Sequence, residues 1–281
     1  MNRKKGNIST FLLTLMLLAG LSLLLYPGIA NYWNSKHQTQ QINSYVEAVS
    51  AIDTSVYEAM LDDARNYNRE LPERENVFLL SDERKARSEK LLNVTGSGVM
   101  GCISIPAINV SLPIYHGTDD AVLQIGVGHL EWTGLPVGGI DTHCVLSGHR
   151  GLPSSKLFSD LDDVVEGDVF VIQVLNDVLT YQVDQIRIVL PGDTDDLQIV
   201  PGKDLCTLVT CTPYGINTHR LLVRGHRIEN LVKSARVVSE AVVIDPLIVA
   251  PIVAFPLLFT LVMMVILKKP EHRPPKKRGG S

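Results

Sequence analysis

Two long apolar runs lie near the ends of the chain and enclose a more polar middle. The first extends over about residues 8–30 and follows a basic tip, and the second extends over about residues 246–267 and precedes a basic tail. Each is long enough to cross a bilayer as a helix, which takes roughly 20 residues. Because the positive charge lies on the outer side of both runs, we expect two membrane spans, with both termini cytoplasmic and the middle outside the cell.

Each apolar run also has a second interpretation. The first could be a cleaved signal peptide, but its apolar stretch exceeds the roughly 7–15 residues usual for one, and no small-residue cleavage site stands out. The second could be a buried core helix. Its length and the Lys268-Lys269 pair that follows favour a membrane span, and membrane helices tolerate its prolines at 246, 251 and 256.

An amphipathic helix is predicted from Trp33 to about Glu70, with Pro72 ending it. Its apolar residues recur at steps of three and four, which places them on one helical face. They are Ile42, Val46, Val49, Ile52, Val56, Met60 and Ala64. We expect this face to pack on the central domain; a coiled-coil dimer is the alternative, for which the stripe is short.

From Val99 onward the apolar residues alternate with polar ones, and glycine and proline mark turns between short segments. The candidate strands cover residues 99–105, 108–114, 144–147, 169–175, 178–190, 205–210 and 221–226. Asn176-Asp177 predicts a tight hairpin, and residues 157–161 predict a short helical turn. Many short strands with such turns indicate an all-β barrel or sandwich.

Length and charge narrow the organisation further. The 281 residues allow one good-sized domain with appendages. Lys+Arg number 26 and Asp+Glu 30, a net charge of −4, which argues against a nucleic-acid surface. The expected parts are an N-terminal anchor (1–30), a helical extension with a possible lid (31–98), a catalytic β domain (99–230), a linker (231–245), a second span (246–267) and a basic tail (268–281).

The chain has four cysteines, at positions 102, 144, 206 and 211. An even number in an exported protein could form two disulfides, but three of them lie in apolar strand-like runs, where buried free thiols are common. Zinc is the other alternative, given histidines at 143, 149, 219 and 226. No Cys-x-x-Cys pair is present, so we expect no metal site.

One segment, residues 207–227, carries a candidate nucleophile. It reads as two strands joined by a loop that contains Pro213-Tyr214-Gly215. Cys211 falls where the first strand meets the loop, and Arg220 opens the return strand. A neighbouring cation favours the reactive thiolate and can hold an oxyanion, which suits acyl transfer. From position alone, a packed core thiol remains the commoner interpretation.

Several motifs together resemble the sortase family. They are Thr-Leu-Val-Thr-Cys at 207–211 with Arg220 downstream, and Gly-His-Arg-Gly at 148–151. The strings Leu-Pro-Ile-Tyr-His-Gly-Thr at 112–118 and Cys-Thr-Pro-Tyr-Gly at 211–215 are similar to class C, the pilin-polymerising sortases. The resemblance covers residues 99–227 and implies a mainly β, sortase-type closed barrel with an N-terminal helical extension and two flanking transmembrane helices.

The resemblance also implies a function. Cys211 would be the nucleophile, His149 the general acid and base, and Arg220 the holder of the oxyanion. The expected protein is a membrane-anchored cysteine transpeptidase on the outer face of a Gram-positive cell. It would cleave a Leu-Pro-x-Thr-Gly-like sorting signal between Thr and Gly and join the acyl group to a pilin lysine, building covalent pili. Its partners would be pilin subunits and membrane lipid, with no cofactor.

Three other functions remain as alternatives. A housekeeping sortase would attach proteins to peptidoglycan, although the second span and the 211–215 string favour class C. A membrane-tethered cysteine peptidase would resolve the thioester with water, and a non-catalytic scaffold would leave Cys211 inert.

Outside the three principal residues, the sequence offers weaker candidates. Class C sortases usually carry an Asp-Pro-aromatic lid near residues 73–92, and this chain has Asp-Pro only at 245–246. Phe78 or Asp82 could substitute, with a surface helix as the alternative. Thr210 and Thr212 could contact substrate, as could the loop at 191–202 through its aspartates at 193, 195 and 196, which could also be simply solvated. His116, His129 and His143 are interpreted as structural.

Overall fold

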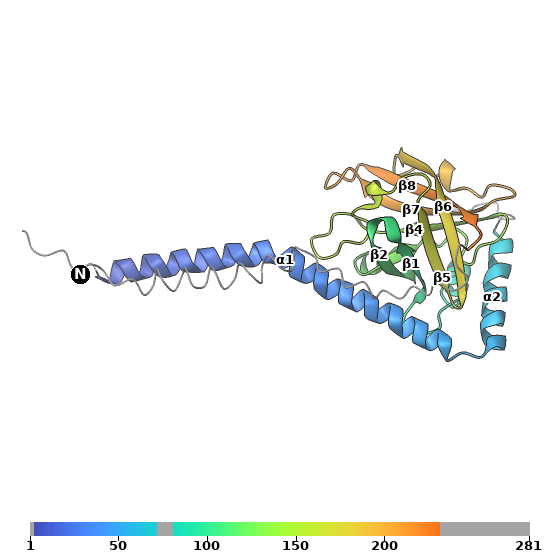
Figure 1. Ribbon diagram of the computed structural model, residues 1–281, viewed down its shortest axis with the longest axis horizontal. Helices are drawn as coiled ribbons and strands as arrows, with labels where there is room; N and C mark the ends of the chain where they lie inside the picture. Colours follow the sequence, from blue (N-terminus) through green and yellow to red (C-terminus); the bar gives the residue numbers. More distant parts are fainter. Residues whose placement is uncertain (1–2, 72–80, 231–281) are drawn as a thin grey trace, which may run out of the picture. The chain divides into compact units, whose positions relative to one another are not determined.

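The computed structural model describes residues 3–71 and 81–230 of the chain (Figure 1). The predicted linker at 231–245, second span at 246–267 and tail at 268–281 lie outside these residues, as does Phe78. The described residues up to Ile29 belong to one compact unit, and a second unit begins at Ala30.

Within the second unit, eight strands close into one barrel in the order β1-β2-β3-β4-β7-β8-β6-β5 (Figure 1). They are Val99–Ile105 (β1), Val110–His116 (β2), Val127–His129 (β3), Thr142–Ser147 (β4), Val169–Val174 (β5), Asp177–Val189 (β6), Asp204–Thr212 (β7) and His219–Ile228 (β8). The predicted closed barrel is confirmed. The short strand β3 was not predicted, and the β5–β6 turn lies at Leu175-Asn176, one residue earlier than expected.

Two strand pairs of the barrel are parallel, β2 with β3 and β4 with β7, and the remaining pairs are antiparallel. In the β4–β7 pair, Ser147 lies opposite Val209. Parallel strands leave a sheet at the same edge. The segments that follow β4 and β7 therefore emerge side by side, although they are far apart in sequence.

The helical extension consists of separate helices. Helix α1 covers Arg3–Ser50, α2 covers Thr54–Arg69, and α3 covers Asp82–Ser88. The prediction of one helix from Trp33 to Glu70 was therefore wrong. The chain breaks at residues 51–53, which shifts the buried face, so that Val56 is 50% exposed.

The second part of α1 packs on the barrel through Ile42, Tyr45 and Val49, all buried. The Tyr45 hydroxyl donates to the Met100 carbonyl (2.9 Å) and accepts from the Leu175 amide (2.7 Å). Helix α2 docks through Asn68, whose amide group exchanges two hydrogen bonds with the Leu135 backbone. The amphipathic pattern thus packs against the catalytic domain, as predicted.

Helix α1 also carries the first apolar run. Among the described residues, α1 is the one helix long and apolar enough to cross a bilayer. It could therefore serve as a membrane anchor.

Helix α3 lies in the segment at residues 73–92, where the class C resemblance implies a lid. The Ser81 hydroxyl caps it, Lys85 forms an ion pair with Glu131 (3.1 Å), and Arg87 pairs with Glu70 (2.8 Å). Asp82 is exposed in its first turn. These contacts are those of a surface helix.

Candidate active site

The first element of the site is the β7–β8 hairpin. Cys211, next to the end of β7, lies directly opposite Arg220 of β8. Its side chain is partly exposed, whereas Cys102, Cys144 and Cys206 are buried, as predicted. The hairpin therefore presents one accessible thiol beside a permanent cation.

The second element is the segment after β4, which carries His149. The Gly148 amide donates to the Val209 carbonyl (3.0 Å), and the Thr210 hydroxyl donates to the Gly148 carbonyl (2.7 Å). A Cβ atom at Gly148 would lie 2.6 Å from the Phe158 ring, so this close approach requires glycine. Because Gly148 is fixed beside Thr210, His149 and Cys211 come next along their two segments, at the same end of the β4–β7 pair.

His149 has a carboxylate neighbour that the sequence did not reveal. Its Nε2 lies 3.6 Å from Oδ1 of Asp120, the first residue of the short helix α4 (Asp120–Leu123). Asp120 is largely exposed and also accepts from Gln124 (3.1 Å). A carboxylate in this position can orient the imidazole, as a third group often does for a catalytic base.

The Arg220 guanidinium is held by neutral acceptors. Its Nη1 donates to the His219 carbonyl (3.1 Å) and to the Asn217 carbonyl (3.3 Å). Backbone carbonyls orient a guanidinium without cancelling its charge. The remaining donors can therefore serve an incoming oxyanion.

Arg150, beside His149, is a second residue that sequence reasoning missed. Its side chain is 8% exposed, forms an ion pair with Asp162, and donates to the Thr212 hydroxyl (3.4 Å). Its guanidinium lies 5.8 Å from the centre of the Tyr214 ring. Arg150 thus ties the His149 segment to the end of β7, and its place in the Gly-His-Arg-Gly motif was the available signal.

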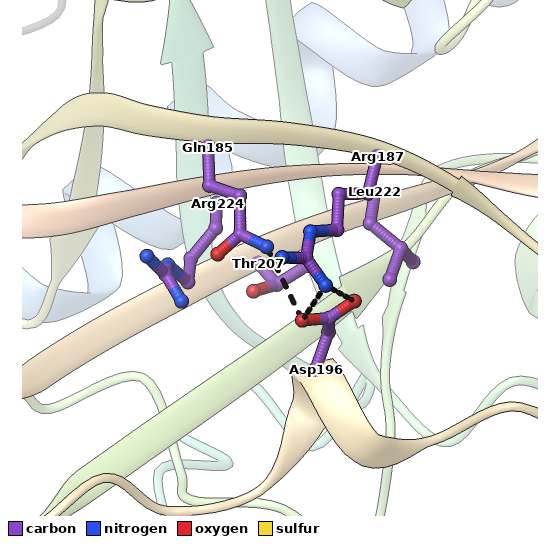
Figure 2. A pocket seen from close by; sticks show the side chains of 6 residues that line it. All are labelled: Gln185, Arg187, Asp196, Thr207, Leu222 and Arg224. Carbon is purple, nitrogen blue, oxygen red and sulfur yellow. Dashed lines mark hydrogen bonds and ion pairs between the residues drawn. The ribbon is translucent and has the colours of Figure 1, made fainter.

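The loop between β6 and β7 is fixed to the outside of the barrel. Asp196 accepts from Gln185 (3.2 Å) and Arg187 (3.1 Å) of β6 (Figure 2). On the other side, His143 bonds to the Gln198 carbonyl (2.8 Å) and the Thr207 hydroxyl (2.7 Å). Asp196 is therefore engaged within the fold, and the space left among the side chains in Figure 2, about 10 Å³, is of the size of one water.

A small apolar cluster lies beneath this loop. Val145, Leu197, Val209 and Leu222 form a small buried cluster separate from the main core. Val209 precedes Cys211 by two residues, so both side chains face the same side of β7. The cluster therefore continues toward the thiol.

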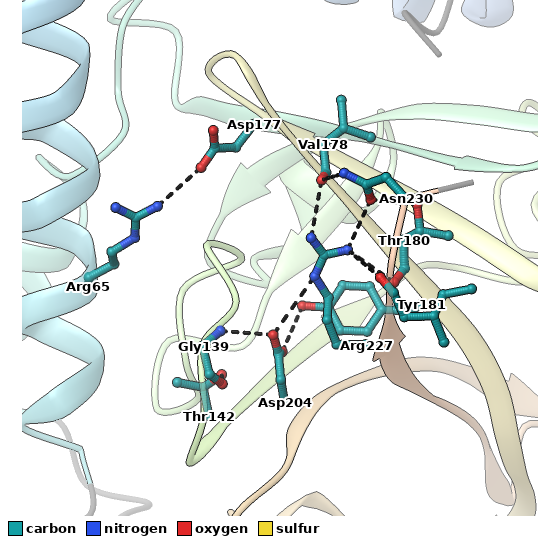
Figure 3. Close-up of polar contacts among 11 residues, drawn as sticks. Arg65, Gly139, Thr142, Asp177, Val178, Thr180, Tyr181, Asp204, Arg227 and Asn230 are labelled. Carbon is teal, nitrogen blue, oxygen red and sulfur yellow. Dashed lines mark hydrogen bonds and ion pairs between the residues drawn. The ribbon is translucent and has the colours of Figure 1, made fainter. Parts of the chain in front are cut away.

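A second polar cluster lies at the opposite end of β7. Asp204 accepts from the Gly139 amide (2.9 Å) and the Tyr181 hydroxyl (3.0 Å), with Arg227 close by (Figure 3). Burial raises the pKa of the Asp204 carboxyl. Arg65 pairs with Asp177 across the same region (3.2 Å). A cavity of about 470 Å³ lies there, but its charged groups largely pair with one another, at the far end of the strand from Cys211.

The remaining titratable groups support the barrel. His116 and His129 are the last residues of strands β2 and β3. His129 is fully buried and bonds to the Gly134 carbonyl (2.8 Å). Burial raises the pKa of Cys102 to about 12. Among the described residues, no group of three or more His, Cys, Asp or Glu side chains could hold a metal ion.

Because His129 is buried, we expect the barrel to lose stability in mild acid. Burial lowers the pKa of its imidazole to about 4, against the bond to Gly134. The unfolded chain, with an imidazole pKa near 6.5, then binds more protons. Below pH 6.5 the free energy of unfolding should fall by about 1.4 kcal/mol per pH unit from this residue, until about pH 4. Urea unfolding of the wild type and His129→Gln between pH 7 and 5 checks this; equal pH slopes would contradict it.

Comparisons with known proteins show which family the chain is similar to. The model of the sortase domain matches residues 103–228. The structure of sortase C1 from Streptococcus agalactiae is 51% identical, covers 68% of this chain and 99% of its own, and superimposes with a TM-score of 0.67. Sortase C from Streptococcus pneumoniae, described with its pilin substrate specificity, is 43% identical over 68% and 97% of the two chains, with a TM-score of 0.62.

A curated relative aligns over a shorter region. Sortase A of S. agalactiae is 33% identical over 117 residues, 41% of this chain, and the alignment spans about half of that protein (47%). The region matched by the sortase domain, residues 103–228, contains most of the closed barrel and the facing pair Cys211 and Arg220. The chain belongs to the sortase family of cysteine transpeptidases.

Proposed function

We propose that this chain is a class C sortase that joins pilin subunits, with Cys211, His149 and Arg220 as its catalytic residues. The observation that carries the proposal is the register of the β7–β8 hairpin, which sets the accessible Cys211 opposite Arg220. The parallel β4–β7 pairing adds His149 at the same end of the barrel.

In the first half-reaction, the Cys211 thiolate attacks the Thr carbonyl of a Leu-Pro-x-Thr-Gly-like signal. Arg220 donates to the resulting oxyanion, and His149 protonates the Gly amine as the Thr–Gly bond breaks. The product is a thioester between Cys211 and the pilin. Histidine suits this role because it exchanges protons near neutral pH.

In the second half-reaction, a lysine amine of another pilin attacks the thioester carbonyl. His149 removes the proton from this amine, Arg220 again holds the oxyanion, and the Cys211 thiolate leaves. An isopeptide bond replaces the thioester, so no cofactor is consumed.

The apolar cluster beside β7 supports a Leu-Pro signal as substrate. Val209 faces the same side of β7 as Cys211 and belongs to a buried cluster with Leu222 and Leu197. Val189 packs against this cluster, is only partly buried and lies opposite Arg220, so it offers apolar surface near the nucleophile. An apolar surface next to the nucleophile suits a Leu-Pro segment that precedes the scissile bond. The similarity to S. pneumoniae sortase C, whose described substrate is a pilin, supports the polymerase over the housekeeping alternative.

The membrane arrangement is part of the proposal. The apolar part of α1 would anchor the catalytic domain, and residues 246–267 would form a second span. Basic residues beyond both runs favour cytoplasmic termini and an extracellular barrel at 99–230, joined to the second span through 231–245. Residues 31–98 would dock α1 and α2 on the barrel, and no acidic Asp-Pro lid anchor is present in 73–92.

Mass spectrometry tests the proposal. The full chain in detergent would be incubated with a pilin that ends in the sorting signal. We expect an acyl adduct on Cys211 and a pilin dimer linked from Thr to Lys. An adduct followed only by hydrolysed pilin would contradict pilin joining and favour a peptidase, and transfer only to a peptidoglycan amine would favour the housekeeping alternative.

A further inference from the structure

Helix α1 presents a row of amide side chains to the barrel just before its apolar contacts begin. Asn31, Asn34 and Gln38 follow one another at steps of three and four, in line with the buried Ile42 and Tyr45. Helical periodicity places all five on one face. The three amide side chains on this face therefore need hydrogen-bond partners on the barrel.

Those partners lie in the segment that follows His149. Oδ1 of Asn31 accepts from the Lys156 amide (2.8 Å), and Nδ2 of Asn34 donates to the Ser154 carbonyl (2.8 Å). The same segment returns to the histidine, because the Phe158 amide donates to the His149 carbonyl (3.1 Å). Helix α1 therefore holds a short closed loop that begins at His149.

Gln38 connects this loop to the other side of His149. Its side chain is 8% exposed, and its Nε2 donates to the Ser155 hydroxyl (3.1 Å) and to the Ile125 carbonyl (3.1 Å). Ile125 lies two residues after the end of helix α4, whose Asp120 lies 3.6 Å from His149. One buried amide thus joins the two segments that together fix the imidazole.

We propose that Gln38, with Asn31 and Asn34, positions His149 for proton transfer. The inference rests on the proposed function, in which His149 is the general acid and base. None of the three amides belongs to the reacting groups, so they are positioning residues. Because the apolar run of α1 precedes Asn31 in the same helix, docking of the anchoring helix becomes a condition for an aligned active site.

The test replaces Gln38 with methionine, which keeps the length of the side chain and removes both donors. Gln41→Met is the matched control, since Gln41 is exposed on the same helix. With the full chain in detergent and a sorting-signal peptide, we expect kcat for acylation of Cys211 to fall about 10- to 100-fold in Gln38→Met, the cost of a small misplacement of a catalytic group. KM should stay unchanged, as should both constants in Gln41→Met.

Two results would overturn the inference. A Gln38→Met protein with a lowered melting temperature but an unchanged kcat per folded molecule would make Gln38 merely structural. If that variant does not fold, Asn34→Ala removes a single bond of the row, and an unchanged kcat there would also overturn it. Product formed by Cys211→Ala would instead mean that the proposed function fails, which separates the two conclusions.

Discussion

Replacing Cys211 with alanine should abolish turnover and leave the fold intact. Removal of a catalytic nucleophile lowers kcat on the order of 10⁶-fold in enzymes that use a comparable set of residues. The side chain lies partly exposed near the end of β7, so the change removes little packing. Peptide cleavage and pilin joining measure the first effect, and thermal unfolding measures the second.

The matched control is Cys206→Ala. Cys206 lies on the same strand but is fully buried, and burial raises the pKa of its thiol well above the usual value. We expect this variant to lose some stability through the small cavity it creates and to retain its activity. Product formed by Cys211→Ala, or a loss of activity confined to Cys206→Ala, would show that the nucleophile is assigned wrongly.

The barrel was largely predictable because its longer strands are rich in apolar and β-branched residues and are separated by turn residues. Strand β1 was predicted at its observed bounds, and β5 to β8 within two residues at each end. Strand β3 was missed because Val127–His129 is too short to show an alternation. Its parallel pairing with β2 depends on long-range contacts, which periodicity does not report.

In the helical extension, too, periodicity alone predicted only part of the structure. The steps of three and four were real in each helix, with Val49 and Ala64 buried. The break at residues 51–53 carries no proline or glycine, the two residues that most often interrupt a helix. The pattern on either side therefore read as one helix.

Within the site, the predictable part is the part that is local in sequence. Cys211 and Arg220 belong to one hairpin, so their pairing follows from two strands and a turn. Asp120 and Gln38 reach the His149 region only through the tertiary fold, from elements far away in the sequence. Side chains that orient a catalytic group in this way leave no motif beside it.

The hairpin also explains why Arg220 is suited to an oxyanion. Cross-strand neighbours on one face lie about 5 Å apart, so the guanidinium stays near the thiol without a carboxylate to hold it. Arg224 lies four residues further along β8 and faces the same side of the strand. Unlike Arg220, it is paired with a carboxylate. It forms a two-point ion pair with Asp184 (2.9 and 3.3 Å).

Arg220→Ala should therefore reduce kcat about 10²- to 10³-fold, or roughly 2.7–4 kcal/mol in the barrier, as expected for the loss of an oxyanion donor. Because the contact strengthens only as the negative charge forms, KM for the peptide should change little. Arg220→Lys should recover part of the rate, since lysine keeps the charge but lacks the planar fork of donors. Arg224→Ala is the matched control and should retain a near-normal kcat. Equal kinetics for the two alanine variants would rule out this role, because only Arg220 lies opposite the nucleophile.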